Sequence, residues 1–550
     1  MNNTFSFFNR DNYIKEIQNT ELDLIIIGGG ITGAGILLDA TSRGLKAALF
    51  EMQDFSAGTS SRSTKLVHGG LRYLKQFEIN LVREVGRERA IVYENGPHVT
   101  KSEPMLLPII KNGSIGHLGA LFGMWLYDML ANVKKGEQRR MIHKPSVLAI
   151  EPMIREDILK SGVYYYEYRT DDSRLTTEII KEAAERGGKA LNYSKVNELI
   201  FDQDKKVSGV KITDGLTGNH YEARAKIIVN ATGPWTDLTD SLDPTSKKDK
   251  LFLTKGVHLV IDSSKFPIGQ AMYFDATEGR MIFAIPRDGK VYVGTTDTAY
   301  SGDISNPKIT AADLKYIIDA INFMFPDLHI TLDDIESGWA GLRPLIKQGG
   351  KKPGEISRKD ETFQYQSGLI SIAGGKLTGY RKMAQRITDL VCNRLKKDSL
   401  VCTTEKINIS GGKVGGADQF DAFVKIKTAE GIILNFTERE ASQLTNRYGS
   451  NIDIIYTIAK DIETEKENFN LPVSVLAEIK YSIYYEMTIT PLDFFIRRTG
   501  ALYFNIDWVR KNHESVIRYM SSLLKWEKAT EDKHLSDLLL KISDILPKAG

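Results

Sequence analysis

A glycine-rich turn near the N-terminus constrains the fold of this chain more than any other feature. Residues 22–27 (LDLIII) form an apolar run of strand length, which predicts a strand buried on both faces. A helical pattern and a second apolar run at 45–50 follow, and Glu51 comes directly after that run. Three glycines in G-x-G-x-x-G spacing join the first run to the helix: Gly28, Gly30 and Gly33. This strand–helix–strand unit predicts an α/β fold with a Rossmann-like dinucleotide-binding domain.

Each part of the unit has a physical role in binding a dinucleotide. Gly28 permits the tight turn, Gly30 lets the backbone approach a pyrophosphate, and Gly33 allows the helix to pack closely on the strand. The helix N-terminus offers unpaired N–H groups to the anion. The Glu51 carboxylate can accept hydrogen bonds from the adenosine ribose. A plain glycine-rich turn before a surface helix is the alternative, and the surrounding pattern disfavours it.

Two later segments favour FAD over NAD as the dinucleotide. Residues 227–233 (IIVNATG) and 369–380 (LISIAGGKLTGY) each run from an apolar strand into small residues. Three such strand ends facing one crevice suit a long, permanently held cofactor. The helix predicted at 379–397 would also direct its N-terminus at the flavin pyrimidine edge, where negative charge develops on reduction.

Composition excludes several classes of protein. Lys and Arg total 73 and Asp and Glu total 70, so the net charge of +3 is too small for a dedicated nucleic-acid binder. Cys392 and Cys402 are the only cysteines, too few for a disulfide framework or a metal cluster, and we predict no metal site. The first 20 residues lack the apolar core of a signal peptide, which predicts a cytoplasmic protein.

The rest of the chain divides into a sheet-rich part and a helical part. The Arg287-Asp288-Gly289 turn indicates antiparallel pairing among the middle strands. Residues 410–416 (SGGKVGG) have the composition of a linker, and 417–550 carries helical spacing throughout. Further strands are predicted at 207–213, 226–231, 257–262, 281–285, 291–294 and 368–373.

A series of eight motifs, in order along residues 20–400, resembles the FAD-dependent glycerol-3-phosphate dehydrogenases of the aerobic, bacterial type. The helical tail also resembles the C-terminal domain of that family. The motifs are 23–51, Gly58–Tyr73 (GTSSRSTKLVHGGLRY), Asn230–Trp235 (NATGPW), Lys255–His258 (KGVH), Gly294–Asp297 (GTTD), Gly341–Pro344 (GLRP), Ser357–Asp360 (SRKD) and Gly374–Arg381 (GGKLTGYR).

The resemblance implies a fold like that of D-amino-acid oxidase. A discontinuous FAD-binding domain is expected at 20–100 with 150–250 and 350–400. A mixed-sheet substrate domain is expected at 101–149 with 251–349, and a helical C-terminal domain at 417–550. The implied reaction is oxidation of sn-glycerol 3-phosphate to dihydroxyacetone phosphate by FAD, with electrons passed to a membrane quinone.

Two departures place the chain among the bacterial-type dehydrogenases. The related glycerol-phosphate oxidases carry an insertion in the substrate half, and only 16 residues separate Arg358 from Gly374 here. The mitochondrial members carry calcium-binding loops, and no D-x-[DN]-x-[DN]-G pattern follows residue 400.

The substrate of this family is a small dianion, and several motif residues suit it. Arginine binds two phosphate oxygens at once with its planar fork. The resemblance implies that four cations lie near the substrate: Arg72, Arg343, Arg358 and Lys376. Tyr73, which follows Arg72 in the sequence, is expected at the same site. A solvated surface ion pair is the alternative for any one of them.

Oxidation of an alcohol needs a base, and histidine is the obvious choice because its pKa lies near neutral. His258, on a predicted strand, is the favoured base, and His68 is expected to contact the flavin. Arg343 could also act on the C2 oxygen, as an electrostatic stabiliser rather than a base. Further contacts to FAD are expected from Thr59, Ser60, Ser61, Gly233, Gly375 and Thr378.

Three alternatives to this function remain open. The chain could be an amine or amino-acid oxidase of the same fold, or a glycerol-3-phosphate oxidase that uses O2. It could also be a non-catalytic flavoprotein whose helical tail binds a partner. The clustered cations favour a phosphate substrate over a carboxylate.

A quinone acceptor implies contact with a membrane. The longest apolar run, residues 118–127, is shorter than the roughly 20 residues that span a bilayer. We therefore expect peripheral attachment to the anionic inner face of the cell membrane, with Leu118–Arg140 as the candidate segment. An ordinary buried helix followed by a solvated basic loop explains this segment equally well.

The sequence leaves the oligomeric state open, with a homodimer as one option.

Overall fold

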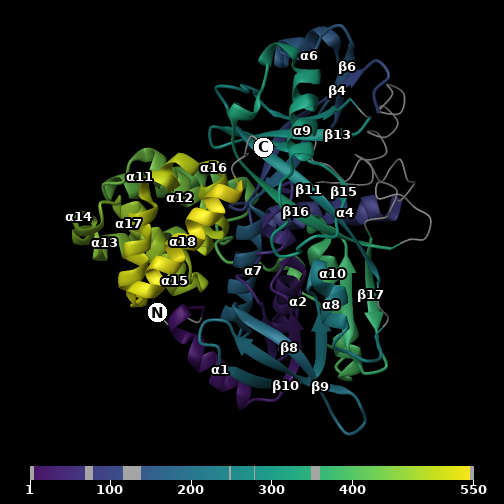
Figure 1. Cartoon of the computed structure of the whole chain (residues 1–550), viewed down its shortest axis with the longest axis vertical. Coiled ribbons are helices and arrows are strands. Elements are labelled where there is room, and N and C mark those ends of the chain that lie inside the picture. Colours follow the sequence, from purple (N-terminus) through teal and green to yellow (C-terminus); the bar gives the residue numbers. More distant parts are fainter. Residues whose placement is uncertain are drawn as a thin grey trace.

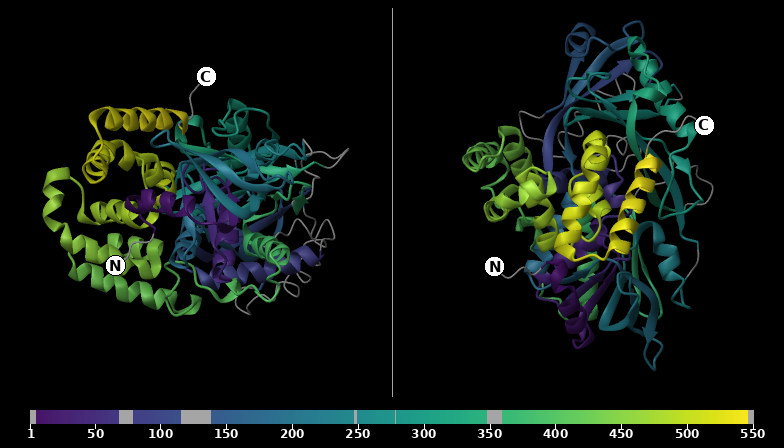
Figure 2. Two further views of the ribbon diagram at one scale, coloured as in Figure 1. Left: turned by 90° about the horizontal axis from the view of Figure 1, so that it is seen from below. Right: turned by 60° about the vertical axis from the view of Figure 1, so that its left-hand side comes forward.

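The computed structural model describes residues 5–67, 79–114, 138–246, 249–277, 279–347 and 359–545. Two sheets form the centre of the molecule, and a group of helices from the C-terminal part lies beside them (Figures 1 and 2). The fold is α/β with an added helical domain, as the sequence predicts.

The first sheet contains the predicted dinucleotide-binding unit. Its main path runs β17-β18-β10-β1-β2-β7, and β1 is buried along its whole length. Its strands are β1 Leu22–Ile27, β2 Ala47–Phe50, β7 Lys189–Leu191, β8 Ser194–Phe201, β9 Val207–Asp214, β10 His220–Asn230, β17 Asp360–Gln364 and β18 Ile370–Gly374. The helix α2, Ile31–Ser42, packs against both α7, Asp172–Glu185, and α10, Tyr380–Arg394.

Parallel pairing brings four strand ends of this sheet to one edge. Ile27 of β1 lies beside Phe50 of β2 and Asn230 of β10, and Asn230 lies beside Ser371 of β18. The residues that follow these strands therefore meet at the same edge, which is where ligands bind in open α/β sheets.

The second sheet is larger and mostly antiparallel. Its main path runs β15-β11-β14-β13-β12-β4-β6-β3, with β16 paired to β11 and β5 paired to β6. The strands β13 and β14 form the predicted hairpin, because Asp288 and Gly289 both have positive φ at the turn. Its strands are β3 Leu66–Val67, β4 Thr100–Ile110, β5 Arg140–His143, β6 Leu159–Thr170, β11 Leu251–Asp262, β12 Ala271–Asp275, β13 Met281–Arg287, β14 Lys290–Gly294, β15 Thr298–Ala299 and β16 Ile335–Ile346.

All six predicted strand segments lie on strands of the structure. Two of them are only the final parts of longer strands, since β10 begins at His220 and β11 begins at Leu251.

The two sheets also refine the expected division of the chain into domains. Because β6 belongs to the second sheet, we propose that residues 159–170 go with the substrate domain rather than with the FAD-binding domain.

The C-terminal part is helical, as predicted. Its helices are α11 Phe420–Ile433, α12 Glu438–Tyr448, α13 Ile452–Asp461, α14 Lys466–Phe469, α15 Val473–Glu486, α16 Ala501–Phe504, α17 Ile506–Leu524 and α18 Lys528–Ile545, with a π-helical turn at Asp493–Arg498. Other helices include α1 Arg10–Gln18, α4 Ile79–Asn95, α6 Lys144–Ile150, α8 Thr236–Asp240 and α9 Ala311–Met324.

Buried ion pairs join the helical domain to the first sheet. Arg498 pairs with Asp54, and both side chains are 0% exposed. Glu486 at the end of α15 pairs with Arg174 of α7 at 2.7 Å. Buried charges of this kind are tolerated only when paired. The helical domain is therefore an integral part of the molecule rather than a loosely tethered appendage.

The glycine-rich segment 410–416 connects the two parts, and its first residues, 410–412, are buried rather than solvated. A Cβ at Gly411 would lie 2.6 Å from the Tyr448 carbonyl oxygen, and Gly412 approaches the Asn95 backbone just as closely. These glycines allow close contact between chain segments, which is why their composition looks like that of a linker. Within the described residues, no helix is long and apolar enough to cross a membrane.

Candidate active site

The glycine turn after β1 brings backbone segments too close together for side chains. Gly28 has φ of +110°, and a Cβ there would lie 2.7 Å from the Ala231 carbonyl oxygen at the end of β10. A Cβ at Gly33 would overlap the carbonyl oxygen of Gly28. These two glycines thus allow β1, β10 and α2 to converge at the edge where the strands end.

Gly30 faces a different environment, beside the N-terminus of α2. Apart from the chain neighbours of Gly30, the one atom of the described structure within 4 Å of a Cβ there would be Ser60 Oγ, at 3.1 Å. Ser60 Oγ also accepts a hydrogen bond from the Ile31 N–H at 2.9 Å. The space over Gly30 is therefore a cradle that a side chain would fill, next to a helix N-terminus suited to an anion.

Glu51 lies beside this cradle. Its Oε2 accepts from the Gly29 N–H at 2.7 Å, and its Oε1 accepts from the Gln53 N–H at 2.9 Å. Burial raises the pKa of Glu51, and these two hydrogen bonds oppose that shift. A carboxylate has about four acceptor positions, so both oxygens can still accept from ribose hydroxyls.

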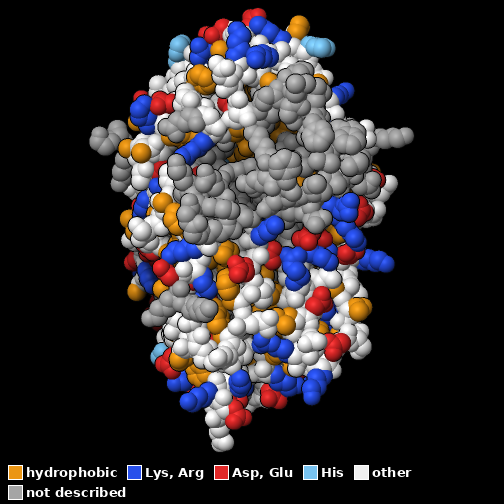
Figure 3. Space-filling view, turned by 90° about the vertical axis from the view of Figure 1, so that its right-hand side faces the viewer, with side chains coloured by type: hydrophobic (Ala, Val, Ile, Leu, Met, Phe, Trp, Pro, Cys, Tyr) orange, Lys and Arg blue, Asp and Glu red, His pale blue; other side chains and the backbone are white. Residues whose placement is uncertain are grey.

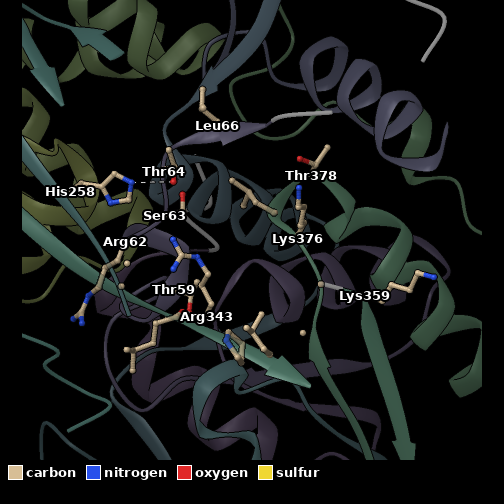
Figure 4. A pocket seen from close by; sticks show the side chains of 18 residues that line it. Thr59, Arg62, Ser63, Thr64, Leu66, His258, Arg343, Lys359, Lys376 and Thr378 are labelled. Atoms are coloured by element: carbon tan, nitrogen blue, oxygen red, sulfur yellow. Dashed lines mark hydrogen bonds between the residues drawn. The ribbon is translucent and has the colours of Figure 1, made fainter. Parts of the chain in front are cut away.

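A pocket opens beside the glycine turn, where the two sheets meet. Figure 4 shows His258 from β11 and Arg343 from β16 on its lining, together with Thr64. Six of the sequence-predicted site residues line this pocket: Thr59, His258, Arg343, Gly375, Lys376 and Thr378. The other predicted cofactor residues in the described structure lie outside the pocket lining: Gly28, Gly30, Gly33, Glu51, Ser60, Ser61 and Gly233.

His258 is almost fully buried and its imidazole is uncharged at neutral pH. Burial lowers the pKa of His258 well below 6.5, and the positive charges of Arg343 and Lys65 lower it further. Its Nε2 lies 3.1 Å from Thr64 Oγ1. A neutral imidazole carries a free lone pair on one nitrogen, so the side chain is in the form that accepts a proton.

Arg343 is held in place by three neighbouring residues of one segment. It donates to Thr295 Oγ1 at 2.9 Å, to the Thr296 carbonyl oxygen at 3.2 Å and to Asp297 Oδ1 at 3.3 Å. The register of β11 and β16 places Arg343 opposite Thr254, four residues from His258 along β11. The Gly294–Asp297 motif therefore orients the guanidinium on the pocket wall.

Lys376 and Lys359 both line the pocket but point differently. The Lys376 ammonium points toward Thr378 in Figure 4, whereas the Lys359 ammonium points away from the other labelled residues. Gly375 has φ of +81°, and a Cβ there would lie 2.5 Å from the Met383 sulfur. The loop after β18 thus approaches α10 closely and directs Lys376 toward the pocket.

Four predicted site residues lie outside the described residues: His68, Arg72, Tyr73 and Arg358. Most of the candidate membrane segment, residues 115–137, also lies outside them. One part of that prediction is wrong, because the Arg139 side chain is only 2% exposed and lies 3.8 Å from Glu167. An arginine buried in this way cannot face lipid headgroups.

Sequence reasoning missed several residues of the pocket and its support. Arg62 and Thr64 line the pocket, and both lie inside the Gly58–Tyr73 motif. That motif could therefore have identified them as pocket residues. Asp172, the first residue of α7, accepts hydrogen bonds from Ser63 and Lys65 and holds the segment that presents Thr64. No sequence pattern linked Asp172 to this segment, because the two are about a hundred residues apart.

The glycine cradle, the acidic residue after β2 and the adjoining pocket with a neutral histidine together define a dinucleotide-dependent oxidoreductase. The family described as FAD-dependent oxidoreductases matches residues 23–381. The C-terminal domain of alpha-glycerophosphate oxidase matches residues 402–531.

Curated relatives and solved structures narrow this class. The chain is 55% identical over 542 residues to an aerobic glycerol-3-phosphate dehydrogenase of Bacillus subtilis, covering 98% of each chain. A solved structure of the glycerol-3-phosphate dehydrogenase from Bacillus halodurans complexed with FAD is 45% identical, covers 99% of each chain and has a TM-score of 0.87. An L-alpha-glycerophosphate oxidase from Mycoplasma pneumoniae, at 15% identity and a TM-score of 0.54, covers 68% of this chain and 95% of its own, and shares the fold alone.

The chain therefore belongs to the FAD-dependent oxidoreductases and, within them, to the aerobic glycerol-3-phosphate dehydrogenase family. The structure fits the cofactor of that family. Gly30 leaves open the space beside a helix N-terminus that a side chain would fill, the Glu51 carboxylate retains acceptor positions, and the buried Ser61 hydroxyl has no partner among the described residues.

Proposed function

We propose that the chain oxidises sn-glycerol 3-phosphate to dihydroxyacetone phosphate. The observation that carries this proposal is that a neutral His258, Arg343 and Lys376 line one pocket beside the dinucleotide cradle. Base and cations in one pocket match a substrate that is both an alcohol and an anion. The names of the full-length relatives support the same substrate.

The cradle over Gly30 and the Glu51 carboxylate would hold FAD, which would supply a hydride acceptor for C2 of the substrate. His258 Nε2 takes the proton of the C2 hydroxyl, so that the carbon–oxygen double bond forms as the hydride departs. The nitrogen is available for this role because burial keeps the imidazole unprotonated. The Thr64 hydroxyl lies 3.1 Å from Nε2, so in this proposal the substrate hydroxyl takes the place of Thr64 at that nitrogen.

We propose that different cations bind the two polar ends of the substrate. We assign Arg343 to the C2 oxygen, because its guanidinium is held on the same pocket wall as His258 and stabilises developing negative charge. We assign Lys376 to the phosphate, together with Arg72, Arg358 and the neighbouring Tyr73 by family resemblance. We assign His68, which stands beside two glycines in the sequence, to the flavin.

Product analysis tests this proposal against its alternatives. The purified enzyme is supplied in turn with sn-glycerol 3-phosphate, glycine and sarcosine, with an artificial electron acceptor present. Dihydroxyacetone phosphate formed from the first compound, and no turnover of the amines, is the expected result. Turnover of glycine or sarcosine alone would identify an amine oxidase of the same fold.

We further propose that the electrons pass to a membrane quinone at the inner face of the cell membrane. On the face shown in Figure 3, Lys and Arg side chains stand among acidic ones, and several gather at the end that carries α6 and α9. Reoxidation of the reduced enzyme by a quinone, faster than by O2, is the expected result. Co-sedimentation with anionic but not neutral liposomes tests the membrane contact, and retention in the supernatant with both would contradict it.

A further inference from the structure

The imidazole of His258 lies flat against the indole of Trp339. The two residues are directly opposite each other in the register of β11 and β16. Their ring centroids are 4.9 Å apart and the ring planes differ by 13°. Both side chains are buried, so this stack is part of the wall behind the pocket.

Hydrogen bonding alone does not fix the orientation of this imidazole. His258 Nδ1 is buried and has no hydrogen-bond partner among the described residues. In most functional histidines a partner on the second nitrogen sets the ring orientation. Among the described residues, the imidazole is held by the contact of Nε2 with Thr64, by the flat stack on Trp339 and by a tilted contact with the ring of Tyr292 at 6.4 Å. The stack is the closest of the ring contacts to His258, so we expect it to contribute most to the orientation of the imidazole.

The indole is itself anchored to the segment that carries Thr64. Trp339 Nε1 donates to the Ser63 carbonyl oxygen at 3.1 Å. The Ser63 side chain donates to the buried carboxylate of Asp172 at 2.7 Å. The stacking partner of His258 and the hydrogen-bonding partner of His258 are therefore connected through one short backbone segment.

Residues of the helical domain also pack against Trp339. The rings of Tyr503 and Phe504, in α16, lie 5.2 Å and 5.8 Å from the indole of Trp339. Ser337, two residues before Trp339 on β16, donates to the Tyr503 carbonyl oxygen at 2.6 Å. Phe504 also lies under the guanidinium of Arg287, at 4.2 Å from its ring centroid. Such aromatic pairs contribute beyond the apolar area that they bury.

We propose that Trp339 is a positioning residue for His258, and that Tyr503 and Phe504 of the helical domain hold the indole in that position. This inference rests on the proposed role of His258 as the base. It gives the C-terminal domain a part in the reaction, because removing its support lets the imidazole rotate away from the substrate. Displacements of about 1 Å at a reacting group can cost up to 10²-fold in rate.

Four variants test this positioning role. Trp339→Leu removes the aromatic face, whereas Trp339→Phe keeps a ring against His258 and loses the bond to Ser63. Phe504→Leu removes the support from the helical domain. Phe495→Leu is the matched control, because Phe495 is also buried in the helical domain but packs on Phe494 and Trp508, away from His258.

Two measurements apply to each variant with FAD bound. The first is the limiting rate of anaerobic flavin reduction, together with the substrate concentration that gives half of it. The second is the imidazole NMR signal of His258 in protein with isotope-labelled histidine, assigned with His258→Gln. The NMR measurement needs no substrate, so it reports on the stack even where the proposed reaction fails.

Trp339→Leu and Phe504→Leu should lower the limiting rate about 10-fold, with the half-saturating concentration changed by less than about 2-fold. Both should shift the His258 signal, because the ring current of the indole is lost or moved. Trp339→Phe should retain most of the rate, and Phe495→Leu should match wild type in both measurements.

Wild-type rate and His258 signal in Phe504→Leu would overturn the role of the helical domain. Equal losses in Trp339→Phe and Trp339→Leu would overturn the role of the stack and assign the effect to the bond with Ser63. If Phe504→Leu does not fold, the two Trp339 variants still decide the role of the stack, and Tyr503→Leu, which removes the other helical-domain ring on the indole, decides the role of the helical domain in the same two measurements.

Discussion

The carboxylate of Glu51 accepts a hydrogen bond of 2.7 Å from the backbone N–H of Gly29. This bond ties the residue expected to bind the ribose to the turn expected to bind the pyrophosphate. A change in the turn therefore affects both contacts to the cofactor.

Gly30→Val should give a folded protein that lacks the yellow colour of bound FAD. The new side chain would meet Ser60 Oγ at 3.1 Å and fill the cradle at the N-terminus of α2. Absorbance of the purified protein measures the FAD content. Gly269→Val is the control, because a Cβ at Gly269 meets no atom within 4 Å. Full FAD content in Gly30→Val would show that the pyrophosphate binds elsewhere.

His258→Gln should lower the anaerobic rate of flavin reduction on the order of 10²-fold while FAD stays bound. Protonation would block a base, and the pKa of His258 lies well below 6.5 because the ring is buried. The wild-type rate should therefore show no loss from protonation of His258 between pH 8 and pH 6.5, and such a loss should begin only at lower pH. Rates measured across this range provide the check. A loss near pH 6.5 that disappears in His258→Gln would contradict the buried, neutral state.

Lys376→Ala should raise the KM for sn-glycerol 3-phosphate about 10-fold or more, because a charge-assisted hydrogen bond to phosphate is worth about 1.5–3 kcal/mol. Lys359→Ala serves as the matched control, since the Lys359 ammonium points away from the other labelled pocket residues (Figure 4). Steady-state kinetics on both variants make the comparison. Similar KM values for the two variants would remove Lys376 from the phosphate site.

Arg498→Met should lower the free energy of unfolding by about 3–5 kcal/mol, because it leaves the buried Asp54 carboxylate with one arginine fewer. Burial alone would raise the pKa of Asp54, but Arg498 and Arg497 hold it at about 2. The stabilisation is thus present at neutral pH and decreases as the pH falls below the ordinary value for aspartate.

Denaturant titrations of Arg498→Met and of Arg510→Met separate a buried pair from a surface pair. Arg510 is 46% exposed and pairs with Asp507 on the surface of α17, so its loss should cost less than about 1 kcal/mol. Equal stability of the two variants would mean that the ion pairs between Arg498 and Asp54 contribute little to the junction of the domains.

Local patterns predicted the first sheet well, for physical reasons. The apolar run of β1 and the glycines after it specify a buried strand and a tight turn without help from distant residues. The strand ends at Asn230 and Ser371 could be placed beside them because parallel strands share an edge. The Gly58–Tyr73 motif likewise marked the segment that lines the pocket.

Long-range partnerships could not be predicted in this way. Asp172 and Ser63 meet only because α7 packs against the segment before β3, and Trp339 faces His258 only through the register of β16 on β11. The helical domain showed no chemical motif, because its contribution is a set of aromatic rings and buried arginines whose partners are hundreds of residues away. The packed glycines Gly411 and Gly412 looked like part of a linker for a related reason, since composition does not show what a glycine lies against.

Anaerobic titration of the purified protein with sn-glycerol 3-phosphate tests the central claim most directly. The account predicts that the oxidised-flavin absorbance disappears after about one equivalent of substrate per FAD, with one dihydroxyacetone phosphate formed for each flavin reduced. Glycine and sarcosine at the same concentration should leave the spectrum unchanged. A flavin that stays oxidised with sn-glycerol 3-phosphate, or one that glycine reduces instead, would contradict the proposed function.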